Sequence, residues 1–350
     1  MAQRTFSIIA NTLLLFVVFG PLVVLLFYAD QNLTFTTADW AALKFTLKQA
    51  ALSSLLSVLL AWPLAVALSR RHFIGRRLLI LTLSVPFILP VIVAVLGLLS
   101  IFGNSGLLNS LLSFFGFPVF SIYGLTGVLL AHIFFNIPLA TRAFLLAIER
   151  RPAELERVAD GLNLKFLMRF WILDWPILRL VAPQIFSLIF ALCLTSFAVV
   201  LTLGGGPKAT TLELAIYQAF RFELDFGRAA FLALIQLSVA ALACCLSILI
   251  FGLPTNFNKG LDRPVYQRYL SIRSSVWDFS VIILLGLFLI LPVISVISEG
   301  VQHFYLLENT IWTSILNSIN LALCSAVIST ILALGFMSKW GEVVGTLSVA

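Results

Sequence analysis

Apolar residues are concentrated in eight long stretches, separated by short segments that carry most of the charged residues. The hydrocarbon core of a bilayer is about 30 Å thick and a helix rises about 1.5 Å per residue, so crossing it takes about 20 apolar residues. Each stretch reaches that length, which predicts eight membrane-spanning helices. We expect their centres near Leu15, Leu56, Val91, Phe135, Leu192, Ala240, Leu285 and Val327.

The composition excludes a soluble globular protein. Of the 350 residues, 61% are hydrophobic and 11% are charged, whereas soluble domains carry about 25% charged residues. The expected fold class is therefore an all-α polytopic membrane protein, a bundle of helices surrounded by membrane lipid. The first stretch runs from about Ile8 to Tyr28. It is longer than the roughly 7–15 apolar residues of a signal peptide, so we interpret it as a retained anchor.

Basic residues set the expected orientation. The net charge is +7, and most of the 22 Lys and Arg residues lie in alternate segments between the apolar stretches. Because basic residues resist translocation, these segments are expected in the cytoplasm, with the N-terminus inside. One of them follows the second span and a longer one lies between the fourth and fifth spans. Short basic loops of this kind are typical of membrane proteins, and we expect no nucleic-acid partner.

A weak internal repeat divides the chain. Ser53, Ser57 and Ala61 match Ser325, Ser329 and Ala333, and a span with an early proline precedes each set. This predicts a first six-span half at residues 1–274 and the first two spans of an incomplete second half at residues 275–350. We infer a partial product of a longer protein. The alternative, a functional eight-span protein, is less expected because an unfinished repeat leaves helix faces without partners.

The sequence from Glu149 to Pro183 predicts two short helices. Pro152 suits a first helical turn, and Glu154 and Glu156 follow where negative charge meets a helix N-terminus, which predicts a helix from Pro152 to about Leu162. Asn163 tolerates the left-handed conformation of a helix-ending turn. A second helix is expected from Leu164, and Trp175-Pro176 should break it before the fifth span.

This segment resembles the EAA loop of ABC-importer permeases, which lies at the same place between two spans. The Glu-Ala-Ala of that loop falls on Arg157, Val158 and Ala159, its glycine on Asn163, and its Ile-x-Leu-Pro on Leu173 to Pro176. The resemblance implies a coupling helix that docks in a groove of the ATPase subunit. It assigns the coupling loop to residues of about 149–179, with the key positions Glu156, Arg157, Val158, Ala159, Asp160, Asn163, Leu173 and Pro176.

Further stretches are similar to the permeases of bacterial thiamine importers. The stretch Leu203 to Gln218 looks like their outer loop after span five, with the signature residues Gly204, Gly205, Gly206, Thr211 and Glu213. The stretches Leu130 to Pro138 and Arg228 to Gln236 are similar as well. The resemblance implies a double-length permease that moves thiamine and its phosphates across the bacterial inner membrane. It also implies two copies of an ABC ATPase subunit and a periplasmic solute-binding protein as partners.

Polar residues inside membrane spans cost free energy and often mark the path of a transported solute. The candidates for such a pathway are Gln49, His132, Asn136, Gln184, Thr195, Ser196 and Gln236. Hydrogen bonding between helices explains each one singly. We expect His132, Asn136, Thr195 and Ser196 to line the path, because His132 and Asn136 lie one helical turn apart before Pro138.

Enzymatic chemistry has no visible basis in the sequence. The chain has no Gly-x-x-x-x-Gly-Lys-Ser/Thr phosphate loop, no Gly-x-Ser-x-Gly nucleophile and no His-Glu-x-x-His zinc motif. The three His residues are scattered, and the four Cys residues lie inside apolar runs without metal-ligand spacing, so we interpret the cysteines as small buried side chains. We therefore expect no enzyme, no ATPase site, no cofactor and no metal site in this chain.

Other transport functions stay open at this point. A ferric-iron or other small-solute ABC permease fits the same patterns as a thiamine permease. An ion-coupled secondary transporter is less expected, because such a transporter usually needs a carboxylate deep in a span. The acid nearest to that description, Asp278, lies near a span end. A structural membrane scaffold is the third class.

Overall fold

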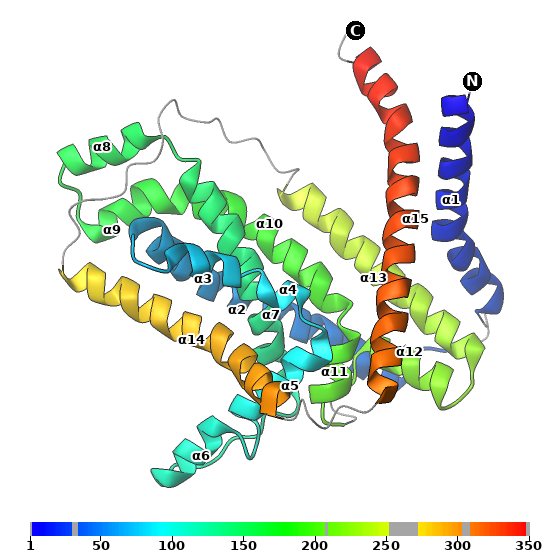
Figure 1. Cartoon of the computed structure of the whole chain (residues 1–350), viewed down its shortest axis with the longest axis horizontal. Helices are drawn as coiled ribbons and strands as arrows, with labels where there is room; N and C mark the ends of the chain where they lie inside the picture. The colour runs from blue at the N-terminus through cyan, green and yellow to red at the C-terminus, as the bar shows by residue number, and fades with distance from the viewer. Residues whose placement is uncertain (1, 30–33, 207–208, 252–271, 303–308, 348–350) are drawn as a thin grey trace.

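The computed structural model describes residues 2–29, 34–206, 209–251, 272–302 and 309–347. Every regular element among them is a helix (Figure 1). In chain order the elements are α1 (Ala2–Tyr28), α2 (Thr37–Arg70), α3 (Arg76–Thr82), α4 (Val85–Ile88), α5 (Val91–Phe102), α6 (Leu107–Phe114), α7 (Leu125–Glu149), α8 (Ala153–Gly161), α9 (Phe166–Arg169), the π-helix η1 (Phe170–Asp174), α10 (Trp175–Leu194), α11 (Phe197–Leu203), α12 (Leu212–Arg221), α13 (Phe226–Phe251), α14 (Ile272–Gln302) and α15 (Asn309–Leu347).

Eight helical stretches of the described chain are long and apolar enough to cross a membrane, as the sequence predicts. They are Ile9–Tyr28, Thr37–Arg70, Val91–Phe114, Leu125–Glu149, Phe170–Leu194, Phe226–Leu249, Ser275–Gln302 and Thr310–Gly335. Six of the expected centres fall well inside these stretches. The third and the fifth do not.

The expected third centre, Val91, lies where one helix stops and another starts. Pro86 occupies the first turn of the four-residue helix α4, and Pro90 directly precedes α5. Proline has no N–H group to donate and restricts the residue before it, so neither position favours the interior of a continuous helix. The apolar run around Val91 is therefore divided into α3, α4 and α5.

The expected fifth centre, Leu192, lies near the end of its span, because α10 stops at Leu194. The break expected at Trp175-Pro176 is absent, since α9, η1 and α10 follow one another without a gap. In η1 the helix is widened, and the N–H of Trp175 donates to the carbonyl of Phe170, five residues back. Pro176 then falls in the first turn of α10, directly after this widened segment.

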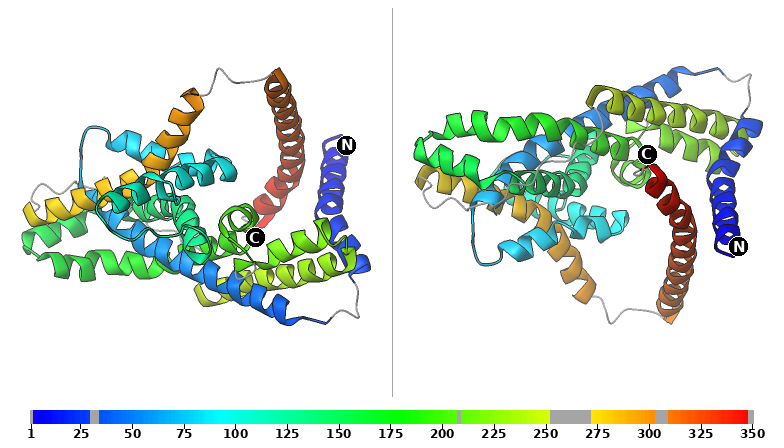
Figure 2. Two further views of the ribbon diagram at one scale, coloured as in Figure 1. Left: turned by 90° about the horizontal axis from the view of Figure 1, so that it is seen from below. Right: turned by 90° about the horizontal axis from the view of Figure 1, so that it is seen from above.

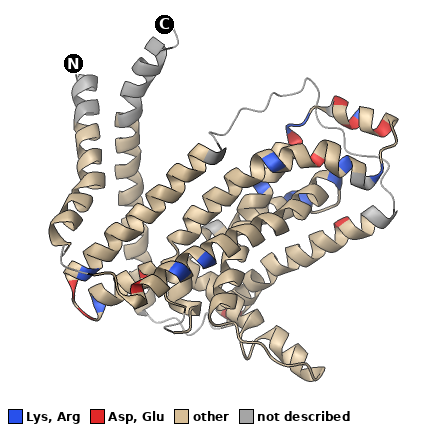
Figure 3. Cartoon of the chain, turned by 180° about the vertical axis from the view of Figure 1, so that it is seen from behind, with Lys and Arg blue, Asp and Glu red and all other residues tan. Residues whose placement is uncertain are grey.

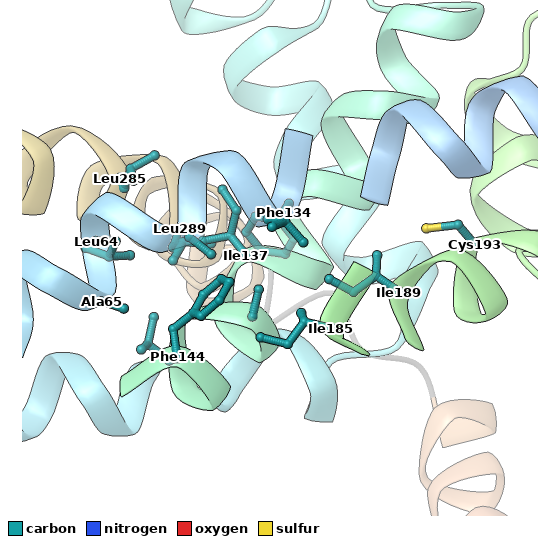
Figure 4. Packing of buried hydrophobic residues seen from close by; sticks show 14 of the residues in the cluster. Leu64, Ala65, Phe134, Ile137, Phe144, Ile185, Ile189, Cys193, Leu285 and Leu289 are labelled. Carbon is teal, nitrogen blue, oxygen red and sulfur yellow. The ribbon is translucent and has the colours of Figure 1, made fainter. Parts of the chain in front are cut away.

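The helix α2 forms the centre of the bundle and packs along α7 and α10. Small residues allow this close approach: Ala50, Ser53, Ser57 and Ala61 are each completely buried. Large apolar side chains fill the space around them, among them Leu64, Phe134, Phe144 and Ile189 (Figure 4). The core is therefore built from the second, fourth and fifth spans.

The helix α14 joins this core, whereas α15 lies apart from it. Leu285 and Leu289 of α14 belong to the buried cluster. Asp278 of α14 forms an ion pair of 2.7 Å with Arg71 at the end of α2. The helix α15 lies beside α1, away from the main bundle (Figures 1 and 2). Of the four cysteines, only Cys193 is buried; Cys244, Cys245 and Cys324 are exposed, which corrects our interpretation.

Charged residues lie mainly toward the two ends of the bundle (Figure 3). We call the end with α8, α9 and the C-terminus of α2 the basic end. It holds Arg70, Arg71, Arg76, Arg151 and Arg169, all of which form ion pairs. The opposite end holds α12 and the start of α2, where Arg228 pairs with Asp39.

Gly97 allows α5 to pack against α14, and this contact gives a stability prediction. A Cβ atom at Gly97 would overlap the carbonyl oxygen of Pro292 and approach the Cγ2 atom of Val296 to 3.0 Å. Gly97→Ala should therefore lower the stability of the protein by about 1–3 kcal/mol, as overpacking does. The measurement is the thermal unfolding midpoint in detergent. The control is Gly286→Ala in α14, whose new Cβ atom would lie 3.8 Å from Leu79. An equal midpoint for both variants would contradict this account of the contact.

Candidate functional site

The segment that the sequence predicts as a coupling loop folds as expected at its start. The helix α8 begins after Pro152, and Glu154 and Glu156 lie in its first turn. It ends at Gly161, within one residue of the expected end at Leu162. The prediction of a short helix from Pro152 to about Leu162 is therefore confirmed.

The turn after α8 has the left-handed residue that the sequence predicts. Asn163 has a φ of 46°, one of two non-glycine residues with positive φ among those described. The N–H of Asn163 donates to the carbonyl of Asp160, and the N–H of Leu164 donates to the carbonyl of Ala159. This pair of hydrogen bonds is the Schellman motif, which satisfies carbonyls at a helix end. The turn reverses the chain and fixes the direction in which α9 leaves.

Alternating charges tie the loop to the membrane helices. Arg151 contacts Glu156 at 3.0 Å and Asp174 at 3.3 Å, and Arg70 of α2 contacts Asp174 at 2.9 Å. On the other side, Arg169 contacts Glu156 at 3.1 Å, and it also contacts Asp160 at 2.8 Å. We call these six residues the charge chain. Except for Asp160, their side chains are 4–12% exposed, so solvent screens these pairs less than ordinary surface pairs.

The remaining loop residues face in different directions. Ala159 is 2% exposed and faces the body of the protein, whereas Val158 is 58% exposed on the outer side of α8. Leu155 and Leu162 are exposed as well, so α8 presents an apolar surface outward. Arg157 is also exposed. Further along, Leu173 is buried in η1 and Pro176 is exposed in α10; both precede the core of the span rather than lying in a separate loop.

The four residues expected to line the path lie together. His132, Asn136, Thr195 and Ser196 all line one pocket of about 380 Å³ between α7, α10 and α11. The pocket lies at the gap between α10 and α11, where Thr195 and Ser196 interrupt the helix. Phe135 and Phe197 contribute aromatic surface to it.

His132 is held between two hydroxyl groups. Its Nδ1 lies 3.0 Å from the Oγ of Ser53, and its Nε2 lies 2.7 Å from the Oγ of Ser196. In a neutral imidazole one ring nitrogen donates and the other accepts, and either serine can take either role. Beside it, the Nδ2 of Asn136 donates to the Sγ of Cys193 at 3.3 Å. The pocket wall therefore combines several hydrogen-bonding groups with a largely apolar surface.

Sequence reasoning missed several partners in these two groups. Ser53 was noted only for its place in the repeat, and Cys193 only as a small buried residue. Arg70 and Asp174 gave no local signal because their partnership joins segments that are 104 residues apart. Of the other polar span residues, Gln49 and Gln236 approach the end of α10, whereas Gln184 lies ten residues before that end.

The outer-loop signature residues build a turn and a helix start at the opposite end. Gly205 and Gly206 have φ values of 71° and 131°, which only glycine adopts readily. Thr211 caps α12, because its hydroxyl accepts from the N–H of Leu214. Burial raises the pKa of the Glu213 carboxyl to about 7. The second part of the expected loop is thus a helix, α12, whose Leu212 N–H donates to Thr46 of α2.

Comparison with known proteins finds relatives that match most of this chain. The chain is 39% identical over 311 residues to the thiamine transport system permease protein ThiP of Escherichia coli K12, covering 87% of this chain and 57% of that protein. It is 37% identical over 303 residues to the ThiP of Haemophilus influenzae, covering 84% of this chain and 55% of that protein. The chain thus spans somewhat more than half the length of these relatives. No protein-family model matches the chain.

A solved structure supplies the fold comparison. A chain of the bacterial alginate ABC transporter, crystallised with its alginate-bound periplasmic protein, superposes with a TM-score of 0.61 at 15% sequence identity. The match covers 70% of this chain and 93% of that chain. The protein is therefore a multi-pass, all-helical membrane protein that shares its fold with this transporter chain and is similar over most of its own length to bacterial thiamine-transport permeases.

Proposed function

We propose that this chain is a transmembrane permease subunit of an ATP-driven importer that moves thiamine and its phosphates across the bacterial inner membrane. The names of its relatives support the solute, and the fold supports the class of transporter. In this proposal residues 1–274 form a first six-span half, and residues 275–350 form the first two spans of a second half. The chain has no ATPase site of its own.

One helix carries the proposal, because α10 joins the coupling loop to the pocket. It follows Asp174 of the charge chain directly and ends at Leu194, next to Thr195 and Ser196 of the pocket. Its 20 residues span about 30 Å. A displacement at the basic end is therefore transmitted along a continuous helix to the place where solute would pass.

The basic end is suited to receive that displacement. By the distribution of its Arg residues it faces the cytoplasm, where two copies of a separate ATPase subunit would bind. The outward apolar surface of α8, with Leu155, Val158 and Leu162, is the part that would enter a groove of the ATPase. The charge chain makes α8 move together with α2 and α10 rather than swing freely.

The opposite end would meet a periplasmic solute-binding protein. The solute released there would reach the pocket at the α10–α11 gap, where His132, Asn136, Thr195 and Ser196 offer hydrogen bonds. Closure of the ATPase pair would then change the side from which this pocket is open. Exposed apolar faces, such as those of α1 and α15, would contact membrane lipid.

The turn at Asn163 gives the first test. Asn163→Val should reduce ATP-dependent thiamine uptake strongly, because a β-branched residue resists the left-handed conformation that α8 needs at its end. Asn163→Gly should keep uptake, since glycine adopts that conformation readily. Uptake is measured in proteoliposomes that hold the full permease with its ATPase and binding protein. Wild-type uptake by the valine variant would remove the turn from the mechanism.

The charge chain gives the second test. Arg151→Met removes both contacts of this side chain and leaves Glu156 and Asp174 with one Arg partner each. Because those partners remain, we expect a stability loss of about 3 kcal/mol or less, at the low end for a broken buried ion pair. We also expect fewer thiamine molecules transported per ATP hydrolysed. The control is Arg179→Met, an exposed residue of α10. An unchanged ratio of transport to hydrolysis in Arg151→Met would contradict the assignment.

A steric plug tests the path. Thr195→Phe places an aromatic ring in the pocket and should lower the uptake rate by at least about tenfold, which corresponds to about 1.4 kcal/mol. Co-purification of the ATPase subunit should persist, because α8 is unchanged. Ser238→Phe serves as control, since Ser238 is exposed on α13. Normal uptake through Thr195→Phe would place the solute path elsewhere.

A further inference from the structure

The C-terminal end of α10 is closed by side chains instead of by backbone. The last four carbonyls of a helix have no partner within the helix and must find one elsewhere. In α10 the hydroxyl of Thr195 donates to the carbonyls of Ala191 and Leu192, at 3.5 and 3.2 Å. The next two carbonyls accept from glutamines: Cys193 from Gln49 and Leu194 from Gln236.

The two glutamines come from different helices and hold the same helix end. Gln49 belongs to α2 and Gln236 to α13, and each Nε2 lies 2.8 Å from its carbonyl oxygen. Gln49 is completely buried and Gln236 is 7% exposed. A helix can stop inside a membrane only where such partners satisfy its free backbone groups. The gap between α10 and α11 is therefore a built feature of the bundle.

Each glutamine leaves its own amide oxygen without a hydrogen bond when it makes this contact. The Oε1 atoms of Gln49 and Gln236 are buried and have no hydrogen-bond partner among the described residues. An unpaired buried acceptor offsets much of what the donated hydrogen bond contributes. Each amide thus fixes the position of the helix end without binding it so firmly that it cannot be released.

The held segment is the wall of the pocket. Cys193, whose carbonyl Gln49 binds, lines the pocket together with Thr195 and Ser196. The side chain of Cys193 is 1% exposed and accepts from Asn136 on the facing helix α7. Loss of either glutamine bond would let this corner of α10 move away from α7.

We propose that Gln49 and Gln236 are positioning residues of the transport path, which hold the end of α10 so that Thr195 and Ser196 face the pocket. They act through the backbone of α10 and do not line the pocket themselves. Release and re-formation of the two bonds would let the α10–α11 gap change shape while α10 itself stays helical. The role of the two glutamines in transport rests on the proposed function, whereas their hold on the end of α10 does not.

The native thiol of Cys193 reports on the gap directly. In this 350-residue chain with Cys244, Cys245 and Cys324 replaced by Ala, Cys193 is the one thiol left to react with a small membrane-permeant maleimide. Gln49→Met and Gln236→Met keep the side-chain length and remove the donor, so each should raise the labelling rate by at least about fivefold. Gln184→Met, in the same α10 helix but ten residues earlier, should leave the labelling rate unchanged. Labelling rates at the control level in both Met variants would overturn the proposal.

A second pair of variants guards against misfolding. Gln49→Asn and Gln236→Asn keep an amide but are one methylene too short to reach the carbonyls, so they should also speed labelling. Uptake by the assembled transporter should fall in its maximal rate for all four variants while the ATPase still co-purifies. Faster labelling with normal thiamine uptake would support the hold of the two glutamines on α10 and refute its role in transport. Slow labelling in the Asn variants, as in the wild type, would refute the proposal that the two glutamines hold the end of α10.

Discussion

Within a bilayer, every backbone group at a helix end must find a partner in the protein, and this constraint decides where the spans of this chain can be interrupted. The interruption after Leu194 exists because three side chains supply donors to the last four carbonyls of α10. At the basic end, α8 instead ends in a backbone turn at Asn163. The free carbonyls at these two helix ends, on which the proposed function depends, are thus satisfied by different groups: side chains in α10 and backbone N–H groups in α8.

Between these two ends lies α10, and the charge chain fixes the place where this helix begins. Single ion pairs near a surface contribute little, because water competes for both partners. Here the Arg and carboxylate side chains alternate, and most are nearly buried, so each of the four inner charges has two neighbours of opposite sign. Such a network holds geometry better than it adds stability, since removal from water costs much of the Coulomb energy gained. For a part that must transmit movement, geometry is the relevant property.

Local sequence patterns predicted local structure well. Eight spans follow from apolar length, and the left-handed turn at Asn163 follows from a residue that tolerates positive φ after a helix rich in early acids. The grouping of His132 with Asn136 follows from helical spacing, but their meeting with Thr195 and Ser196 depended on the choice of polar span residues rather than on any spacing. That pocket was foreseen as a set of residues, and its position at a helix gap was not.

The failures have a common physical origin in tertiary context. Hydropathy averages over Pro86 and Pro90, so it placed a span centre where the backbone changes helix. It also placed the fifth centre at Leu192 because the apolar run continues through the gap into α11. The pairing of Arg70 with Asp174 could not be read from either segment alone, because it exists only when α2 and η1 pack together.

The widened segment η1 has a consequence for every residue that follows it. A π-helical turn adds one residue to the winding of an α-helix, and each residue of an α-helix turns by about 100°. The insertion therefore rotates the faces of α10 by about that angle against the numbering carried over from α9. The buried residues of α10, namely Ile177, Val181, Ile185 and Ile189, recur every four residues after this segment. They form the face of α10 that packs into the core.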